Sequence, residues 1–230
     1  PGLGWCAGWL GKVVRVAGTG EAEAIAAIFG RRWRAVGLHN VPEPCLNVPL
    51  FDTGIMLRWA TARDPAVVAR YGVALTRGLI SVRCGAMAQH FPAHGATPLD
   101  SHTSYPAITL DRETLLRDHL ESYRSCFEAG CTTLCTAHLA CPALDPAPKH
   151  IATTSRVILN DFLRGELGFQ GLIIADAIEM RGFQKNGPPA IVSVDAINAG
   201  CDSLCLCSRG VEPVEQVFEA ILAAVEVGRI

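Results

Sequence analysis

The sequence predicts an α/β protein in which parallel strands alternate with helices. Short apolar runs of strand-like composition alternate with longer segments whose apolar residues recur at helical spacing. Half of the 230 residues are hydrophobic, enough for a sizeable core, and Gly and Pro are frequent without forming low-complexity runs. This alternation is typical of βαβ units built around a parallel sheet.

Six short apolar runs are predicted strands. They are residues 12–16, 45–48, 84–90, 132–137, 171–175 and 203–207. The second run lies in a proline-interrupted region, so only a short strand is expected there. The fifth, GLIIA, has the most strand-like composition, because β-branched residues favour strands.

Six longer segments with helical spacing are predicted helices. They are residues 21–36, 64–80, 111–129, 154–166, 192–199 and 211–227. The second opens with Asp64-Pro65, a favourable helix start, and Gly130 stops the third. These elements make about six β/α units, whereas a closed (β/α)₈ barrel has eight strands. A doubly wound open sheet shows the same alternation, so periodicity leaves both architectures open.

Charge and hydropathy argue against two classes of partner. The net charge is -2 with no basic stripe, so nucleic acid is not expected as a partner. The apolar runs are far shorter than a membrane span, so no membrane association is expected. The first residues lack a basic segment followed by an apolar one, so no signal peptide is expected. The chain does not start with Met and is expected to begin inside a longer protein.

Ten cysteines raise the question of a metal site or a disulfide framework. The spacings C-x₃-C-x₅-C at residues 131–141 and C-x₃-C-x-C at residues 201–207 differ from the C-x-x-C pairs typical of zinc sites. Several of these cysteines lie in apolar runs, where cysteine acts as a small buried hydrophobe. So many core thiols favour a reducing compartment, and we expect a cytoplasmic location.

Polar residues follow three of the predicted strands, where chemistry gathers in parallel α/β folds. Asp176 comes directly after GLIIA, and a carboxylate there would be costly to bury unpaired. Asp176 could instead cap a helix that starts near Ile178, and both interpretations stay open. His138 follows the fourth strand and by itself favours a hydrogen-bonded histidine without catalytic function.

The segment HFPAHGATPLDSH contains three histidines and an aspartate. Asp100 can accept the Nδ1–H of His102 and fix its tautomer, which makes the pair a candidate proton-transfer unit. A metal site is the competing use, with His90, His94, Asp100 and His102 as ligands. Pro92 interrupts the helix that would bring the first two imidazoles together, which disfavours the metal site.

Several segments resemble glycoside hydrolase family 3. HFPAHGATPLDSH is similar to the KHFPGHGDT…DSH signature of the branch that contains β-N-acetylhexosaminidases. TAHLACPALDP and TTSRVILNDFLRGELGFQGLIIADAIEM resemble the next strand end and the nucleophile segment. GKVVR, LRWATARDPAVVARYGVALTRGL and AINAGCDSLCLCS match other parts of the family pattern, and the match runs in order over about residues 11–230.

The resemblance implies a (β/α)₈ TIM-type barrel. Residues 1–230 would form one barrel domain truncated at both ends, with about strands two to seven present. A further domain or the missing segments of the same protein would complete it. No metal and no organic cofactor is implied.

The resemblance also implies that terminal β-linked N-acetylglucosamine is hydrolysed with retention of configuration. Asp176 aligns with the nucleophile, and His102 with Asp100 aligns with the acid/base pair. The DSH element points to the N-acetylglucosaminidase branch and away from β-glucosidases. The expected substrate contacts are Arg58, His90, His138, Gln89 and Met180.

Several positions depart from the family pattern. Gln89 replaces a lysine, Ala93 a glycine and Ala96 an aspartate, and Asn47 stands where an aspartate is expected. AGWLG at residues 7–11 replaces an Asp-Gln-Glu-Gly-Gly motif. Each lost hydrogen bond to a charged group would cost about 1.5–3 kcal/mol of binding. A degenerate member that binds sugar, or nothing, without hydrolysis is therefore the alternative hypothesis.

Overall fold

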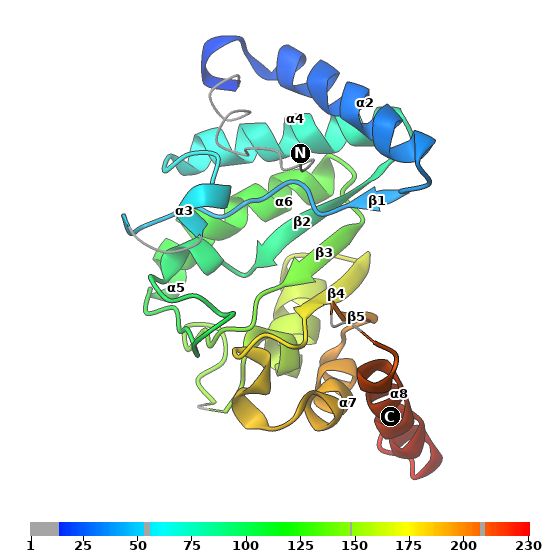
Figure 1. The fold of residues 1–230 in the computed structure, drawn as a ribbon. Coiled ribbons are helices and arrows are strands. Elements are labelled where there is room, and N and C mark those ends of the chain that lie inside the picture. The colour runs from blue at the N-terminus through cyan, green and yellow to red at the C-terminus, as the bar shows by residue number, and fades with distance from the viewer. Residues whose placement is uncertain (1–13, 53–55, 148, 208–209) are drawn as a thin grey trace. The chain divides into compact units, whose positions relative to one another are not determined.

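The structure, a computed structural model, describes residues 14–52, 56–147, 149–207 and 210–230. The chain divides into two compact units. Unit 1 comprises Pro1–Pro98 and Leu110–Cys135, and unit 2 comprises Leu99–Thr109 and Thr136–Ile230. Figure 1 labels the α-helices and strands of both.

The strands of unit 1 lie side by side in the order in which they occur along the chain. They are β1 (Asn40–Val41), β2 (Gly85–Phe91) and β3 (Thr133–Thr136), whose last residue already belongs to unit 2. β1 and β2 pair in parallel, with Asn40 opposite Gly85. Helices connect successive strands, which is the βαβ arrangement that the sequence predicts.

The helices of unit 1 pack closely against one another. They are α2 (Thr19–Ala35), α3 (Met56–Trp59), α4 (Pro65–Ser81), η1 (His94–Ala96), α5 (Arg112–Leu115), the π-helical η2 (Leu116–Leu120) and α6 (Glu121–Glu128). α2 lies along α4 (Figure 1). A Cβ added at Gly78 would lie 2.2 Å from the carbonyl oxygen of Glu23, so only glycine allows this approach.

The sequence of α4 explains why it starts where it does. The carboxylate of Asp64 accepts the backbone N–H of Ala66 at 2.8 Å, and Pro65 at the first helical position needs no such partner. Val68 and Tyr71 are fully buried on the face toward the core. Capping and amphipathic spacing therefore define this helix locally.

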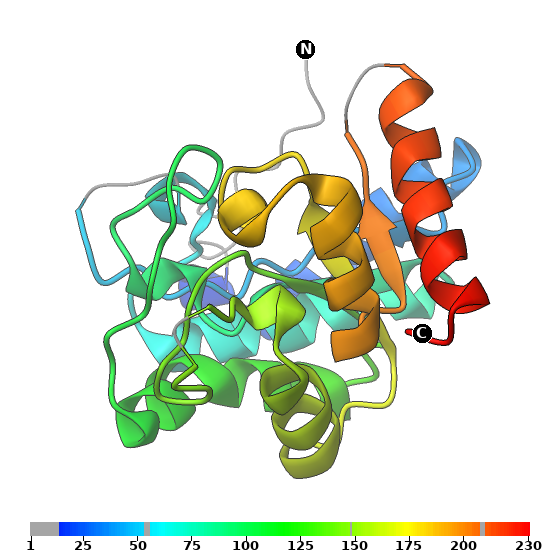
Figure 2. The ribbon, with the colours of Figure 1, turned by 90° about the horizontal axis from the view of Figure 1, so that it is seen from below.

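Unit 2 contains β4 (Leu172–Ala177) and β5 (Ser203–Cys205), which pair in parallel. Its helices are η3 (Ala152–Thr154), the π-helical η4 (Val157–Glu166), η5 (Phe183–Asn186), α7 (Pro189–Ala199) and α8 (Glu212–Glu226). α7 packs against α8, as Figure 2 shows. The carboxylate of Asp202 accepts the backbone N–H of Ile173 and the guanidinium of Arg164, both at 2.8 Å, and so ties the start of β5 to β4 and η4.

All six predicted helices are present, and four predicted strands correspond to β2, β3, β4 and β5. The strand expected at residues 12–16 is wrong, because residues 14–16 are helical while residues 12 and 13 lie outside the described part. So short an apolar run does not distinguish strand from helix. The strand expected at residues 45–48 is reduced to an isolated bridge between Cys45 and Gln89, since the neighbouring prolines lack the N–H that a ladder needs.

The α/β class and its parallel pairing are confirmed. Closure into an eight-stranded barrel stays a prediction. Within the described ranges, no helix is both long and apolar enough to cross a lipid bilayer. Seven of the cysteines in those ranges are buried, whereas Cys205 is partly exposed and Cys207 is exposed.

Candidate active site

Asp176 lies at an irregularity near the end of β4. In the ladder with β5, Ala175 is opposite Leu204 and Ala177 is opposite Cys205, so Asp176 is the extra residue of a β-bulge. A bulge redirects a side chain and is frequent beside active sites. One carboxylate oxygen of Asp176 accepts the N–H of Ala177 at 2.8 Å, and the residue is partly exposed.

The interpretation of Asp176 as a helix N-cap is wrong. Residues 178–182 form turns, with the N–H of Met180 donating to the carbonyl of Ala177 at 3.0 Å. The next helical segment, η5, begins only at Phe183. The carboxylate of Asp176 therefore does not serve a helix start at residue 178.

Asp100 and His102 form a hydrogen-bonded pair on the loop that belongs to unit 2. One oxygen of Asp100 accepts both the backbone N–H of His102, at 2.9 Å, and its imidazole Nδ1, at 2.7 Å. Because a carboxylate can only accept, Nδ1 must carry the hydrogen, which leaves Nε2 as the nitrogen that exchanges a proton. The side chain of His102 is 53% exposed, so solvent and ligands can reach it.

The chain that follows Asp176 is bonded to the loop that carries this pair. The N–H of Gly182 donates to the carbonyl of Ser101 at 2.8 Å, and the N–H of Arg181 donates to that of His102 at 3.3 Å. A Cβ added at Gly182 would lie 2.5 Å from the carbonyl oxygen of His138, so a side chain does not fit there. Unit 2 thus holds the predicted nucleophile, near the end of β4, and the predicted acid/base pair, on a loop that is hydrogen-bonded to the segment after β4.

His138 is fully buried beside the bulge. Its Nε2 donates to the carbonyl of Ala177 at 3.2 Å, and its Nδ1 is 2.8 Å from the hydroxyl of Thr153. The ring of His138 also packs on that of Phe183, with centroids 4.9 Å apart. His138 therefore anchors the residue next to Asp176, and its contact with substrate stays a prediction, as does that of the buried Met180.

The other predicted substrate residues lie in unit 1. Gln89 is buried, and its amide donates to the carbonyl of Pro42. The amide nitrogen of Asn47 is 3.0 Å from Nδ1 of His90. Arg58 lies in α3, but its side chain is outside the described part of the structure, as is the AGWLG segment. Substrate contact by Arg58, His90 and Gln89 stays a prediction.

Comparison with known proteins identifies the family. Residues 13–230 match the model described as Glycosyl hydrolase family 3 N terminal domain. The chain belongs to glycosyl hydrolase family 3. The resemblance carried by the HFPAHGATPLDSH and GLIIAD segments is therefore confirmed.

Several relatives within family 3 are named Beta-hexosaminidase. The one from Nitrosospira multiformis is 34% identical over 182 residues, which are 79% of this chain and 51% of the relative. The one from Aromatoleum aromaticum is 29% identical over 204 residues, which are 89% of this chain and 56% of the relative. The chain thus spans about half the length of the curated relatives that it matches.

A solved family 3 structure supports the fold. It is the β-N-acetylglucosaminidase from Paenibacillus sp. str. FPU-7, which is 33% identical and matches with a TM-score of 0.87. The match covers 98% of this chain and 42% of that chain. The α/β architecture described above is thus that of a family 3 N-terminal domain.

Metal ligation gains no support from the arrangement of the residues. Within the ranges that the structure describes, no three His, Cys, Asp or Glu side chains are grouped so that they could hold a metal ion. The rings of His90 and His94 lie 6.1 Å apart at 73°, in an edge-to-face contact.

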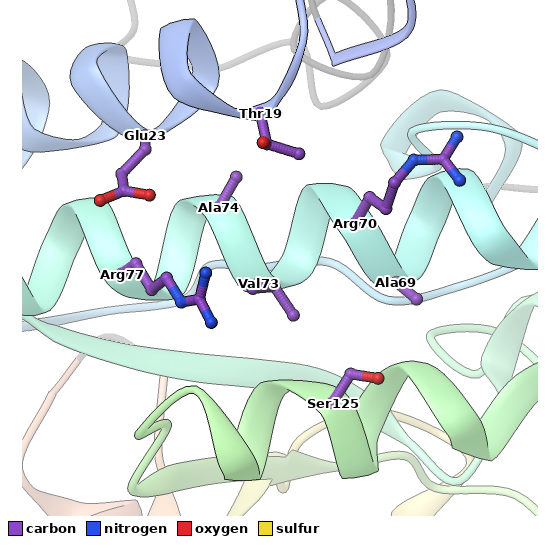
Figure 3. A pocket seen from close by; sticks show the side chains of 8 residues that line it. All are labelled: Thr19, Glu23, Ala69, Arg70, Val73, Ala74, Arg77 and Ser125. Atoms are coloured by element: carbon purple, nitrogen blue, oxygen red, sulfur yellow. The ribbon is translucent and has the colours of Figure 1, made fainter.

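A hollow of about 190 Å³ lies in unit 1 (Figure 3). It is a groove on the outer side of α2, α4 and α6, and its lining includes Glu23, Arg70, Arg77 and Ser125. Both arginines are exposed surface residues, and none of the predicted site residues takes part. This hollow is therefore not the candidate site of the family 3 domain.

The sequence did not reveal two residues that support the site. Thr153 bonds His138 from 15 positions further along the chain, and no spacing pattern signals such a pair. Gly182 is required by the close approach of Ser101 and His138, which only the folded chain shows. Thr153 supports the end of β4 through His138, and Gly182 allows the close approach of the segment after β4 to the loop that carries His102.

Proposed function

We propose that this chain is the catalytic part of a retaining β-N-acetylglucosaminidase. Asp176 is the nucleophile, and His102 held by Asp100 is the acid/base. The observation that carries the proposal is the hydrogen bond that Nδ1 of His102 donates to Asp100, on a loop that is hydrogen-bonded to the segment after Asp176. The names of the family 3 relatives support the substrate class.

The reaction has two steps, each of which inverts the anomeric carbon: Asp176 attacks from the face opposite the leaving group, and water then attacks from the face that the leaving group occupied. In the first, a carboxylate oxygen of Asp176 attacks the anomeric carbon while Nε2 of His102 gives its proton to the leaving oxygen. The glycosidic bond breaks and a glycosyl ester forms on Asp176. In the second, Nε2 takes a proton from water, the water oxygen attacks the same carbon, and the ester bond breaks with net retention.

Each residue has a property that suits its part. The bulge places Asp176 in a partly exposed position at the end of the strand. Asp100 holds Nδ1–H of His102, so a single nitrogen handles the proton in both steps. Imidazole exchanges protons readily near neutral pH, which allows the same ring to act as acid and then as base.

The substrate in this proposal is a glycan that ends in β-linked N-acetylglucosamine. Arg58, His90, Gln89, His138 and Met180 are proposed to hold the sugar or to support the residues that do. Neither a metal ion nor an organic cofactor takes part in the proposed steps.

Replacing the nucleophile tests the proposal. Asp176→Asn is expected to lower turnover of a chromogenic N-acetylglucosaminide by at least about three orders of magnitude, because the covalent route is lost. Asp161→Asn, which changes an exposed aspartate on η4 of the same unit, is the matched control and is expected to keep the wild-type rate. Equal rates for wild type and Asp176→Asn would contradict the proposal.

The alternative is a family member that binds N-acetylglucosamine without cleaving it. Two residues that depart from the family pattern favour this alternative. The side chain of Gln89 is hydrogen-bonded to Pro42 and that of Asn47 to His90, both within unit 1. Calorimetry with N-acetylglucosamine, run beside the turnover assay, separates the two. Binding without turnover supports the alternative, and turnover abolished by Asp176→Asn excludes it.

A further inference from the structure

We propose that Cys205 and Cys207 are a modification site, a dithiol that closes to an intramolecular disulfide beside Asp176. Their sulfur atoms are 3.5 Å apart, and both thiols are reduced in the structure. Cys205 is the last residue of β5, and Cys207 follows two positions later, beyond the strand. A disulfide needs a sulfur separation of about 2.05 Å, which side-chain rotation and a small local shift can supply.

Exposure distinguishes this pair from the other described cysteines. Cys207 is exposed and Cys205 is partly exposed, whereas the seven others in the described ranges are buried. Oxidants reach exposed thiols first, so Cys207 is the residue that reacts initially. The expectation that the cysteines of this chain are buried hydrophobes holds for those seven and fails for this pair.

The pair also lies against the segment that carries the proposed nucleophile. Cys205 is opposite Ala177 in the ladder, and its carbonyl accepts the N–H of Ile178 at 3.0 Å. The pKa of the Cys205 thiol is raised to about 12, mainly by burial and in smaller part by the hydrogen bond with Cys207 and the charges of Asp176 and Glu179.

The oxidant is a peroxide, and the steps balance. The Cys207 thiolate attacks one oxygen of hydrogen peroxide, the O–O bond breaks, and a sulfenic acid and water form. The Cys205 sulfur, on losing its proton, attacks the Cys207 sulfur; the S–S bond forms, the S–O bond breaks, and a second water leaves. Two thiols and one peroxide thus give one disulfide and two waters.

Peptide mapping of the purified protein tests the site directly. After mild hydrogen peroxide treatment and alkylation of the remaining thiols, the peptide that contains both cysteines is expected to carry no alkyl group and to have lost two hydrogens. Dithiothreitol is expected to reverse this, and Cys207→Ser to prevent it, while Cys84→Ser, at a buried cysteine of unit 1, is expected to leave closure unchanged. Full alkylation of both residues after peroxide, or a disulfide from either one to another cysteine, would overturn the proposal.

The effect on Asp176 is a second measurement and rests on the proposed function. Closure is expected to lower kcat by at least about tenfold, because small displacements of catalytic groups cost rate steeply, and reduction is expected to restore it. Cys207→Ser is expected to keep its rate after peroxide. An unchanged rate in the closed protein would contradict the link to Asp176. Absence of turnover in the reduced protein would instead refute the proposed function, and peptide mapping would still decide the disulfide.

Discussion

Two groups in unit 1, Glu43 and His119, lie in a setting opposite to that of the Asp100–His102 pair in unit 2. In unit 1, Glu43 and His119 are enclosed. Burial raises the pKa of Glu43 to about 7 and lowers that of His119 to about 4, which in both cases favours the neutral form. In unit 2, His102 and Asp100 are partly exposed and hydrogen-bonded to one another. The groups of unit 1 whose pKa is displaced by burial are thus enclosed, whereas the proposed chemistry belongs to accessible paired groups.

The same contrast appears at two strand ends. At the end of β2, Gln89 is buried and its amide is bonded to the backbone of Pro42. Near the end of β4, the bulge at Asp176 leaves the carboxylate partly exposed. Changes in unit 2 are therefore expected to alter chemistry, and changes to the enclosed groups of unit 1 to alter stability.

The largest expected effect is on catalysis, in unit 2. His102→Ala is expected to lower turnover of an N-acetylglucosaminide by about 10²–10⁴-fold, because the proton donor and acceptor is lost. The loss is expected to be smaller for a substrate whose leaving group needs no protonation, since only the second step then needs His102. His39→Ala, at an exposed histidine of unit 1, is the control. Equal losses for both substrates would show that His102 has only a structural part.

A second prediction concerns acid stability in unit 1. His119 is buried, and burial lowers its pKa from 6.5 to about 4. Between these values the unfolded chain binds a proton that the folded chain does not, so the free energy of unfolding falls by about 3 kcal/mol as pH falls from about 6.5 to about 4. His119→Leu is expected to remove this dependence, as measured by urea unfolding at pH 7 and pH 4.5 relative to wild type. The same pH dependence in both proteins would contradict it.

Glu43 is expected to act in the opposite direction. Burial raises its pKa from 4.5 to about 7, against the lowering effect of bonds from the Cys45 N–H and the Tyr71 hydroxyl. The contribution of Glu43 to the free energy of unfolding is therefore fully present below about pH 4.5 and is lost as pH rises through about 7. Glu43→Gln, which keeps an oxygen acceptor, is expected to raise the free energy of unfolding at pH 8 by about 1–3 kcal/mol and to change it little at pH 4.5. A variant no more stable than wild type at pH 8 would refute this.

The smallest expected effect tests the junction of the two loops in unit 2. In Gly182→Ala the new Cβ would lie 2.5 Å from the carbonyl oxygen of His138, so the loops must separate. We expect a loss of about 1–2 kcal/mol in the free energy of unfolding and a lower turnover. Gly165→Ala is the matched control, because its Cβ would meet the nearest atom at 3.5 Å inside η4, where alanine favours the helix. Thermal unfolding and the turnover assay on both variants decide the point.

Local signals in the sequence were sufficient for much of the fold. Asp64-Pro65 marks the start of α4, and the apolar run before Asp176 marks β4, because caps and side-chain periodicity act between residues a few positions apart. The Asp100–His102 hydrogen bond is also local, since the two residues are only two positions apart in the chain. The resemblance to family 3 rests on such contiguous segments and was confirmed by the family model.

Tertiary contacts decided the features that depend on distant partners. The helical turn at residues 14–16 and the loss of a strand at residues 45–48 follow from packing and proline placement that a short apolar run does not encode. The bulge at Asp176 exists only against β5, and the bond from His138 to Ala177 spans 39 positions. Hydrogen bonds and ladder registers between residues so far apart form only when the whole chain brings them together, so the sequence identified the chemical groups and the fold determined how they are held.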